Sequence, residues 1–227
     1  MTFFDRVAKT SVAVSIPLAW SNRVLPRLQL DLRGRTIANA GFATGYALIF
    51  RGRPNWLSAR GLGYGLASAG VVAIGYGAAV AIPALRRRLG GFAERAPDVP
   101  LVEWVAVHIP IGTVYSEELI FRATLNPLLD KVFGPLGGAL IGAGTFGLWH
   151  VHPARAAGDS VPASIAATAA GGLLFELLRR RTDTATAPAL LHFAVNVGGA
   201  LAPLIATRCC QKVEFFDLPK RVSCRGR

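Results

Sequence analysis

Long apolar runs that carry almost no charge constrain the fold of this chain more than any other feature. A helix needs about 20 apolar residues to cross the hydrocarbon core of a bilayer, and it satisfies its backbone hydrogen bonds internally. Charged residues make up only 17% of the chain, against about 25% in soluble domains. Six runs are apolar in this way: residues 36–50, 62–85, 101–129, 132–149, 161–178 and 185–206. The sequence therefore predicts an all-α fold, a polytopic transmembrane helix bundle with about six spans.

The bundle is expected to occupy residues 36–207, with a different kind of segment on each side. The N-terminal arm, residues 1–35, contains a modest apolar piece at 12–20 that Pro17 interrupts. Because this piece is too short to span, we expect an interfacial N-terminal helix. Residues 208–227 change to a charged composition and are predicted to form a cytoplasmic tail.

The net charge of +12 comes mostly from arginines, which stand in short blocks at the ends of apolar runs, as at 86–88 and 179–181. This placement favours contact with the headgroups of a lipid bilayer. It argues against nucleic-acid binding, which would need a basic stripe interleaved with aromatic residues. If all six runs span, the more basic loops share one side with both termini, and the positive-inside rule makes that side cytoplasmic. The preference for arginine over lysine suggests a bacterial cytoplasmic membrane.

Acidic and basic residues inside an apolar run are costly, at about 2.5–3.5 kcal/mol each at the bilayer centre, and usually have a function. The run at 101–129 contains Glu117, Glu118 and Arg122. Glu118 and Arg122 are four residues apart, so they share a helix face and can form an ion pair that keeps Glu118 ionised. Glu117 is rotated by about 100° from Glu118. As the unpaired carboxylate, Glu117 is the natural general base.

Two later runs each carry a pair of motif residues at helical spacing. Phe146 and His150 end one run, and His192 and Asn196 lie in the last one, each pair four residues apart. Since each pair shares a helix face, His150, His192 and Asn196 can meet Glu117 in one buried cluster. Glu117 with His150 could then activate a water. His192 and Asn196 could donate hydrogen bonds to the oxyanion that forms when a peptide carbonyl is attacked.

Each of these features also has a structural explanation. The Glu118–Arg122 pair can serve stability alone, His150 can face the membrane interface, and His192 with Asn196 can hydrogen-bond between helices. The three features together, on three separate apolar runs, favour a catalytic site over coincidence.

Several other polar residues are interpreted as structural. Glu103 and His108 precede Glu117 by about 14 Å or more along one helix axis and are expected near the membrane interface. Glu176 is expected to form an ordinary end-of-helix ion pair with the arginines at 179–180. The tryptophans at run ends suit an interfacial aromatic belt: Trp56, Trp104 and Trp149.

The residues singled out above form three motifs, in this order: Glu117-Glu118-x-x-x-Arg122, Phe146-x-x-x-His150 and His192-x-x-x-Asn196. This order resembles the CPBP family of intramembrane proteases, also called Abi or CAAX prenyl protease 2 (Rce1)-like. All three motifs match without a substitution. They lie within residues 115–196, and the resemblance covers about residues 100–207.

The resemblance implies a role for each motif residue. Glu117 would be the catalytic glutamate and His150 its partner in positioning the water. His192 and Asn196 would form the oxyanion hole. The supporting residues would be Glu118, Arg122 and Phe146.

We therefore expect an intramembrane endopeptidase that hydrolyses a peptide bond of a membrane-associated peptide or protein by glutamate-activated water. The best-known activity of the family removes the last three residues of prenylated CaaX proteins, but the substrate of this chain stays open. No cofactor is favoured. One alternative is a zinc protease in which Glu117, His150 and His192 hold the metal. The others are a non-enzymatic membrane scaffold or immunity protein, and a transporter that uses the carboxylates as a relay.

Overall fold

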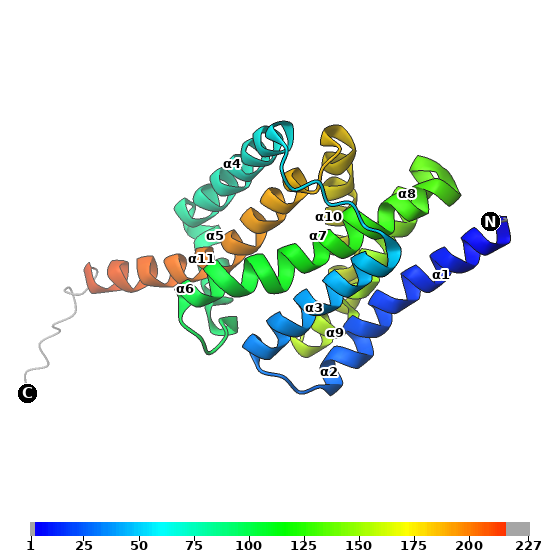
Figure 1. Ribbon diagram of the computed structural model, residues 1–227. Helices are drawn as coiled ribbons and strands as arrows, with labels where there is room; N and C mark the ends of the chain where they lie inside the picture. The colour runs from blue at the N-terminus through cyan, green and yellow to red at the C-terminus, as the bar shows by residue number, and fades with distance from the viewer. Residues whose placement is uncertain (1–2, 217–227) are drawn as a thin grey trace, which may run out of the picture.

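The computed structural model describes residues 3–216, and every regular element in this range is a helix, which confirms the all-α prediction. Residues 217–227, most of the predicted tail, lie outside the described residues. Figure 1 shows the helices packed as a bundle. The longer ones are α1 (Phe3–Ala19), α3 (Leu32–Phe50), α4 (Ala59–Ala81), α8 (Asn126–Trp149), α10 (Val161–Thr182) and α11 (Thr186–Phe216).

One long helical segment passes through the middle of the bundle (Figure 1). It begins with α6 (Leu101–Glu103), continues as a π-helical stretch (Trp104–Tyr115), and passes through α7 (Ser116–Ile120) and a second π-helical stretch (Phe121–Leu125) into α8. π-Helical turns inside α-helices are uncommon and often occur at functional sites. Here they flank the α-helical turn that contains the two adjacent glutamates.

α8 is a helical hairpin with its turn at Gly134. Gly134 has φ 71° and ψ 173°, which glycine adopts without strain, and Pro135 starts the next helix. A Cβ atom on Gly142 would collide with the Asn126 side chain, so the two arms pack closely. We call residues 126–133 the outgoing arm and 135–149 the returning arm. The predicted apolar runs before and after this turn are therefore separate helices.

Four segments are long and apolar enough to cross a membrane: Ala59–Ala81, Leu101–Ala156, Val161–Thr182 and Thr186–Arg208. The second of these contains both arms of the α8 hairpin, so it can account for two crossings. Large apolar side chains point outward on these and neighbouring helices, such as Leu48 (76% exposed) and Ile74 (74% exposed). A surface of this kind suits lipid, and the chain is an integral membrane protein. About six spans remains a prediction, with α3 as the sixth.

The N-terminal helix is longer than the apolar piece at 12–20 suggested. α1 continues through a π-helical turn (Trp20–Val24) into α2 (Leu25–Arg27). It runs along α3, where Tyr46 donates a hydrogen bond to the Ala13 carbonyl, at 2.8 Å. Its start and the end of α11 lie at opposite ends of the bundle (Figure 1). The expectation that both termini share one side assumed that residues 1–35 lie flat on the membrane, whereas this helix runs the length of its neighbour.

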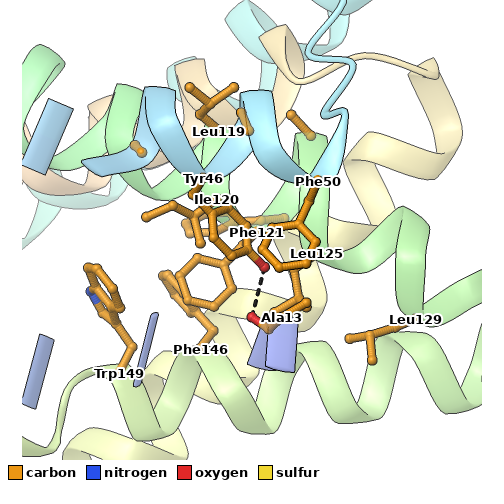
Figure 2. Packing of buried hydrophobic residues seen from close by; sticks show 14 of the residues in the cluster. Ala13, Tyr46, Phe50, Leu119, Ile120, Phe121, Leu125, Leu129, Phe146 and Trp149 are labelled. Atoms are coloured by element: carbon orange, nitrogen blue, oxygen red, sulfur yellow. Dashed lines mark hydrogen bonds between the residues drawn. The ribbon is translucent and has the colours of Figure 1, made fainter. Parts of the chain in front are cut away.

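The core gathers aromatic and branched side chains from α3, the central segment and α8. Figure 2 shows Tyr46, Phe50, Phe121 and Phe146 packed together, with Trp149 at one edge. This core surrounds the turn that carries the glutamates, and it holds that turn away from lipid and water.

Candidate active site

The two adjacent glutamates both point into the bundle. Glu117 is 7% exposed and Glu118 is fully buried. Burying a carboxylate is costly unless hydrogen bonds or opposite charges compensate it. The partners of these two side chains therefore define the site.

Glu118 lies between a histidine and an arginine. Its Oε1 accepts a hydrogen bond from Nδ1 of His192 at 2.8 Å, and its Oε2 lies 3.5 Å from Nε of Arg122. The predicted ion pair between residues 118 and 122 is present. The contact with His192 was not predicted, because the sequence does not reveal which face of α11 meets α7.

The guanidinium of Arg122 is enclosed by aromatic rings. It lies 4.3 Å from the ring centre of Phe146, 4.9 Å from that of Phe175 and 5.7 Å from that of Phe121. Cation–π attraction of this kind is worth about 2 kcal/mol or more when water is excluded. Arg122 is only 1% exposed, so it supplies a fixed positive charge beside Glu118.

His192 connects the two glutamates. Since Nδ1 donates to Glu118, the other ring nitrogen, Nε2, faces Oε2 of Glu117 at 3.7 Å. The ring stacks on Phe175, with centroids 4.8 Å apart. An imidazole whose Nδ1–H is fixed by a carboxylate has a defined orientation and tautomer, as in other acid–base pairs. His192 is therefore set to exchange a proton at Nε2.

Glu117 has one occupied and one open oxygen. Its Oε1 accepts a hydrogen bond from Nε1 of Trp149 at 3.1 Å. Its Oε2 is buried and has no hydrogen-bond partner among the described residues. Assigning Trp149 to an interfacial belt was wrong, because this residue is 4% exposed and contacts the candidate base. Its position next to His150 in a motif was the one available signal.

His150 and Asn196 are less closely involved than predicted. Nδ1 of His150 donates to the carbonyl of Phe146 at 2.8 Å, and Nδ2 of Asn196 donates to the carbonyl of His192 at 3.0 Å. Both side chains are half-buried. Within the described part of the chain, neither side chain hydrogen-bonds a glutamate. Glu117 and His192 thus meet as predicted, while the other two lie along their own helices.

His150 also lines a cavity of about 380 Å³ between α9 (Val151–Ala156) and the start of α10. Asp159, Ser164 and Thr168 lie on the same cavity wall. With Nδ1–H bound to a carbonyl, the neutral ring presents Nε2 as an acceptor. The imidazole can therefore bind water or a substrate N–H group.

Two further sets of buried polar side chains lie outside the site, around His108 and around Glu176. His108 is buried and contacts Thr36 at 2.8 Å and Glu103 at 3.1 Å, and Glu103 pairs with Arg33. The predicted pairs of Glu176 with the arginines at 179–180 are present, but Glu176 is 1% exposed and belongs to a larger cluster described below.

The zinc alternative needs three ligand side chains around one point. Among residues 3–208, no group of three His, Cys, Asp or Glu side chains is placed to hold a metal ion. Glu117 and His192 are close, but His150 is bonded to its own helix. This arrangement of Glu117, His150 and His192 does not fit a three-ligand zinc site.

Comparison with known families gives one match. Residues 99–198 match the family model described as type II CAAX prenyl endopeptidase Rce1-like. This range contains all three motifs. Searches of curated proteins and of solved structures returned no match.

Proposed function

We propose that the chain is an intramembrane endopeptidase in which Glu117 activates the attacking water, since residues 99–198 match the type II CAAX prenyl endopeptidase Rce1-like family model. The observation that carries the proposal is the open carboxylate oxygen of Glu117, buried and 3.7 Å from Nε2 of His192. A buried carboxylate with one free oxygen beside an oriented imidazole is suited to take a proton from water.

The two carboxylates have different roles in this mechanism. Glu118 lies between Arg122 and His192 and fixes the ring of His192 through its hydrogen bond to Nδ1. Glu117 takes a proton from water as the hydroxide attacks the scissile carbonyl. The proton held by Glu117 passes to Nε2 of His192 and from there to the leaving nitrogen as the C–N bond breaks, which releases the amine and the carboxylic acid and restores both side chains. Trp149 holds the Glu117 carboxylate in place through its indole N–H.

His150 and Asn196 act on the substrate in this proposal. Each has to turn from its present backbone acceptor, by rotation of one or two side-chain bonds, to reach a bound peptide. His150 would position the water. Asn196 would donate a hydrogen bond from its side-chain amide N–H to the developing oxyanion. Donors of this kind are worth about 10²–10³-fold in rate.

A lipid-anchored substrate is supported by an apolar groove between α4 and α11. The groove has a volume of about 770 Å³ and is lined on the α11 side by Leu190, Phe193, Ala194 and Val197. His192 and Asn196 project from another face of α11, so the groove and site are separated by about one helix width, 10 Å. A hydrocarbon chain in the groove would keep its attached peptide within reach of the site.

We also propose an orientation for the bundle. The basic loop at 86–100 lines a pocket with Pro203 and Leu204 of α11, and Arg95 of this loop pairs with Asp159 of the loop at 150–160, so both loops lie near the end of α11. Under the positive-inside rule this end faces the cytoplasm, together with the C-terminal segment. The start of α1 then faces the opposite side.

The test uses purified protein in proteoliposomes with quenched, membrane-anchored peptides, including prenylated CaaX peptides. Wild type is compared with Glu117→Gln and with Glu94→Gln, a control outside the site, each with and without a zinc chelator. We expect wild type and Glu94→Gln to cleave the peptides equally with and without the chelator. Glu117→Gln should not cleave them under either condition. Loss with chelator and recovery with zinc would replace the glutamate mechanism by a metal mechanism. Ion flux without any cleaved product would favour a transporter.

A further inference from the structure

Three basic side chains from two helices converge on one pocket near the start of α1. We call this pocket the α1–α8 notch. It has a volume of about 350 Å³ and is lined by Arg6, Lys9 and Thr10 of α1 and by Leu128, Lys131 and Val132 of the outgoing arm of α8. On each helix the lining residues are spaced i, i+3 and i+4, so each helix contributes one continuous face.

Neighbouring carboxylates offset only part of the positive charge of the notch. In the described part of the chain, no ion pair involves Arg6, Lys9 or Lys131. Asp130, the neighbour of Lys131, is bound by two arginines of α10. Asp5 lies next to Arg6 in sequence and reduces the local charge by one. The notch therefore keeps a net positive charge and favours an anion.

The surroundings of the notch are apolar and exposed. Phe4 is 82% exposed, Phe133 41% and Leu136 74%. The start of α1 and the turn of α8 lie together at one end of the bundle (Figure 1). Cations beside exposed aromatic and aliphatic side chains at the end of a membrane bundle match the boundary between headgroups and acyl chains. A soluble anion would gain nothing from these apolar side chains.

We propose that the α1–α8 notch binds the phosphodiester headgroup of an anionic phospholipid, whose acyl chains run over Phe133 and Leu136. The basic side chains contact the phosphate oxygens, and Leu128 and Val132 contact the glycerol backbone. Basic pockets between membrane helices bind anionic lipid headgroups. In the orientation proposed above, the notch takes its lipid from the leaflet opposite the cytoplasm. This site is separate from the candidate active site and does not depend on the proposed function.

The experiment measures lipid binding to the purified full chain by native mass spectrometry, with phosphatidylglycerol and phosphatidylcholine titrated separately. Wild type is expected to prefer phosphatidylglycerol. Lys9→Gln combined with Lys131→Gln should weaken phosphatidylglycerol binding by about five-fold for each cation, or about 25-fold together. Lys9→Arg combined with Lys131→Arg should retain the affinity. The matched control is Arg87→Gln with Arg88→Gln, which removes two exposed charges from α5 (Pro83–Gly90) and should leave the affinity unchanged.

Three results would overturn the proposal. An equal loss in the α5 control would mean that total charge, not the notch, attracts the lipid. Full affinity in the double glutamine variant would place the lipid elsewhere. Equal binding of inorganic phosphate, measured by calorimetry, would make the notch a phosphate site rather than a lipid site. None of these readouts involves peptide cleavage, so a failure here leaves the protease proposal unaffected.

Discussion

Two ionic clusters in the described part of the chain, each built around a buried glutamate, differ in their hydrogen bonding. One is the candidate active site around Glu117 and Glu118. The other joins the α8 hairpin to α10: Asp130 and Glu176 with Arg179, Arg180 and Asn126. Each cluster has two carboxylates, so composition alone does not separate them.

In the hairpin cluster every carboxylate oxygen has a partner. Oε1 of Glu176 accepts from both arginines, and its Oε2 accepts from Asn126 and from Nε of Arg179. The oxygens of Asp130 each accept from one arginine, at 2.6 and 2.9 Å. Two carboxylates face two guanidinium groups, so the charges cancel. Oδ1 of Asn126 is buried without a hydrogen-bond partner among the described residues, but the carboxylates and the guanidinium groups are paired with one another. Pairing of this kind fixes helix positions and leaves no carboxylate oxygen free to react.

In the candidate site several buried side-chain nitrogen and oxygen atoms have no hydrogen-bond partner in the described part of the chain. Two carboxylates are accompanied by a single guanidinium, that of Arg122, which pairs with Glu118 alone. Oε2 of Glu117, Oε2 of Glu118 and all three nitrogens of Arg122 have no hydrogen-bond partner among the described residues. Such a site is costly to the fold, and native proteins keep few of them without a functional reason. The comparison therefore favours a structural role for the hairpin cluster and supports the catalytic role that we propose for the candidate site.

The largest expected effect comes from Glu117→Gln. Glutamine keeps an acceptor for the indole of Trp149 but cannot take a proton from water, so cleavage should fall by about 10²–10⁴-fold. The unfolding midpoint should stay close to that of wild type, since the change removes a buried charge without removing volume. Turnover by quenched peptides and thermal unfolding in detergent are measured on the same preparation. A folded variant with full activity would remove Glu117 from the mechanism.

The corresponding change in the hairpin cluster is Glu176→Ala. It leaves two arginines without their main acceptor, and breaking a buried ion pair on one side costs about 3–5 kcal/mol. Here the arginines can reach water, since Arg180 is 27% exposed, so we expect the lower end of that range. Unfolding in a denaturing detergent measures the loss. Activity per folded molecule should be unchanged, and a stable but inactive variant would contradict the division between the clusters.

Local spacing made part of this arrangement predictable. The apolar runs marked the helices, and the pairing of Glu118 with Arg122 followed from their i, i+4 positions on one helix. The pairs of Glu176 with its two arginines were predictable for the same reason. All of these depend on the geometry of one helix.

Contacts between helices were not predictable from spacing. His192 was assigned to an oxyanion hole, yet its Nδ1 binds Glu118, because the rotation of α11 about its own axis depends on packing across the bundle. Trp149 contacts Glu117 because the α8 hairpin closes tightly where Gly142 meets Asn126. The same hairpin brings Asp130 to α10. No local pattern in a single sequence predicts how each helix is rotated about its own axis in the bundle.

A smaller effect on stability and turnover is expected from Arg122→Lys. This substitution keeps the positive charge of the candidate site and therefore tests the geometry of the guanidinium alone. Lysine loses the planar stacking on Phe146 and Phe175 and the fixed direction of the guanidinium. We expect a stability loss of about 1–2 kcal/mol, with reduced turnover because Glu118 and His192 are less well oriented. The control is Arg181→Lys, an exposed arginine on α10, which should change neither quantity. Unchanged turnover in Arg122→Lys would mean that only the charge matters at this position.

The smallest expected effect is that of Trp149→Phe, which tests whether the indole N–H positions the base. The ring of phenylalanine can keep the edge-to-face contact with Phe121, whose centroid lies 5.7 Å from that of Trp149. What is lost is one hydrogen bond to Glu117, worth about 1 kcal/mol, or about five-fold in kcat. KM should be unchanged, because the indole does not contact substrate in this mechanism. Trp104→Phe, at a tryptophan outside the site, is the control. A fall in stability with kcat unchanged would make Trp149 a packing residue, and the satisfied oxygen of Glu117 would then be as structural as those of the hairpin cluster.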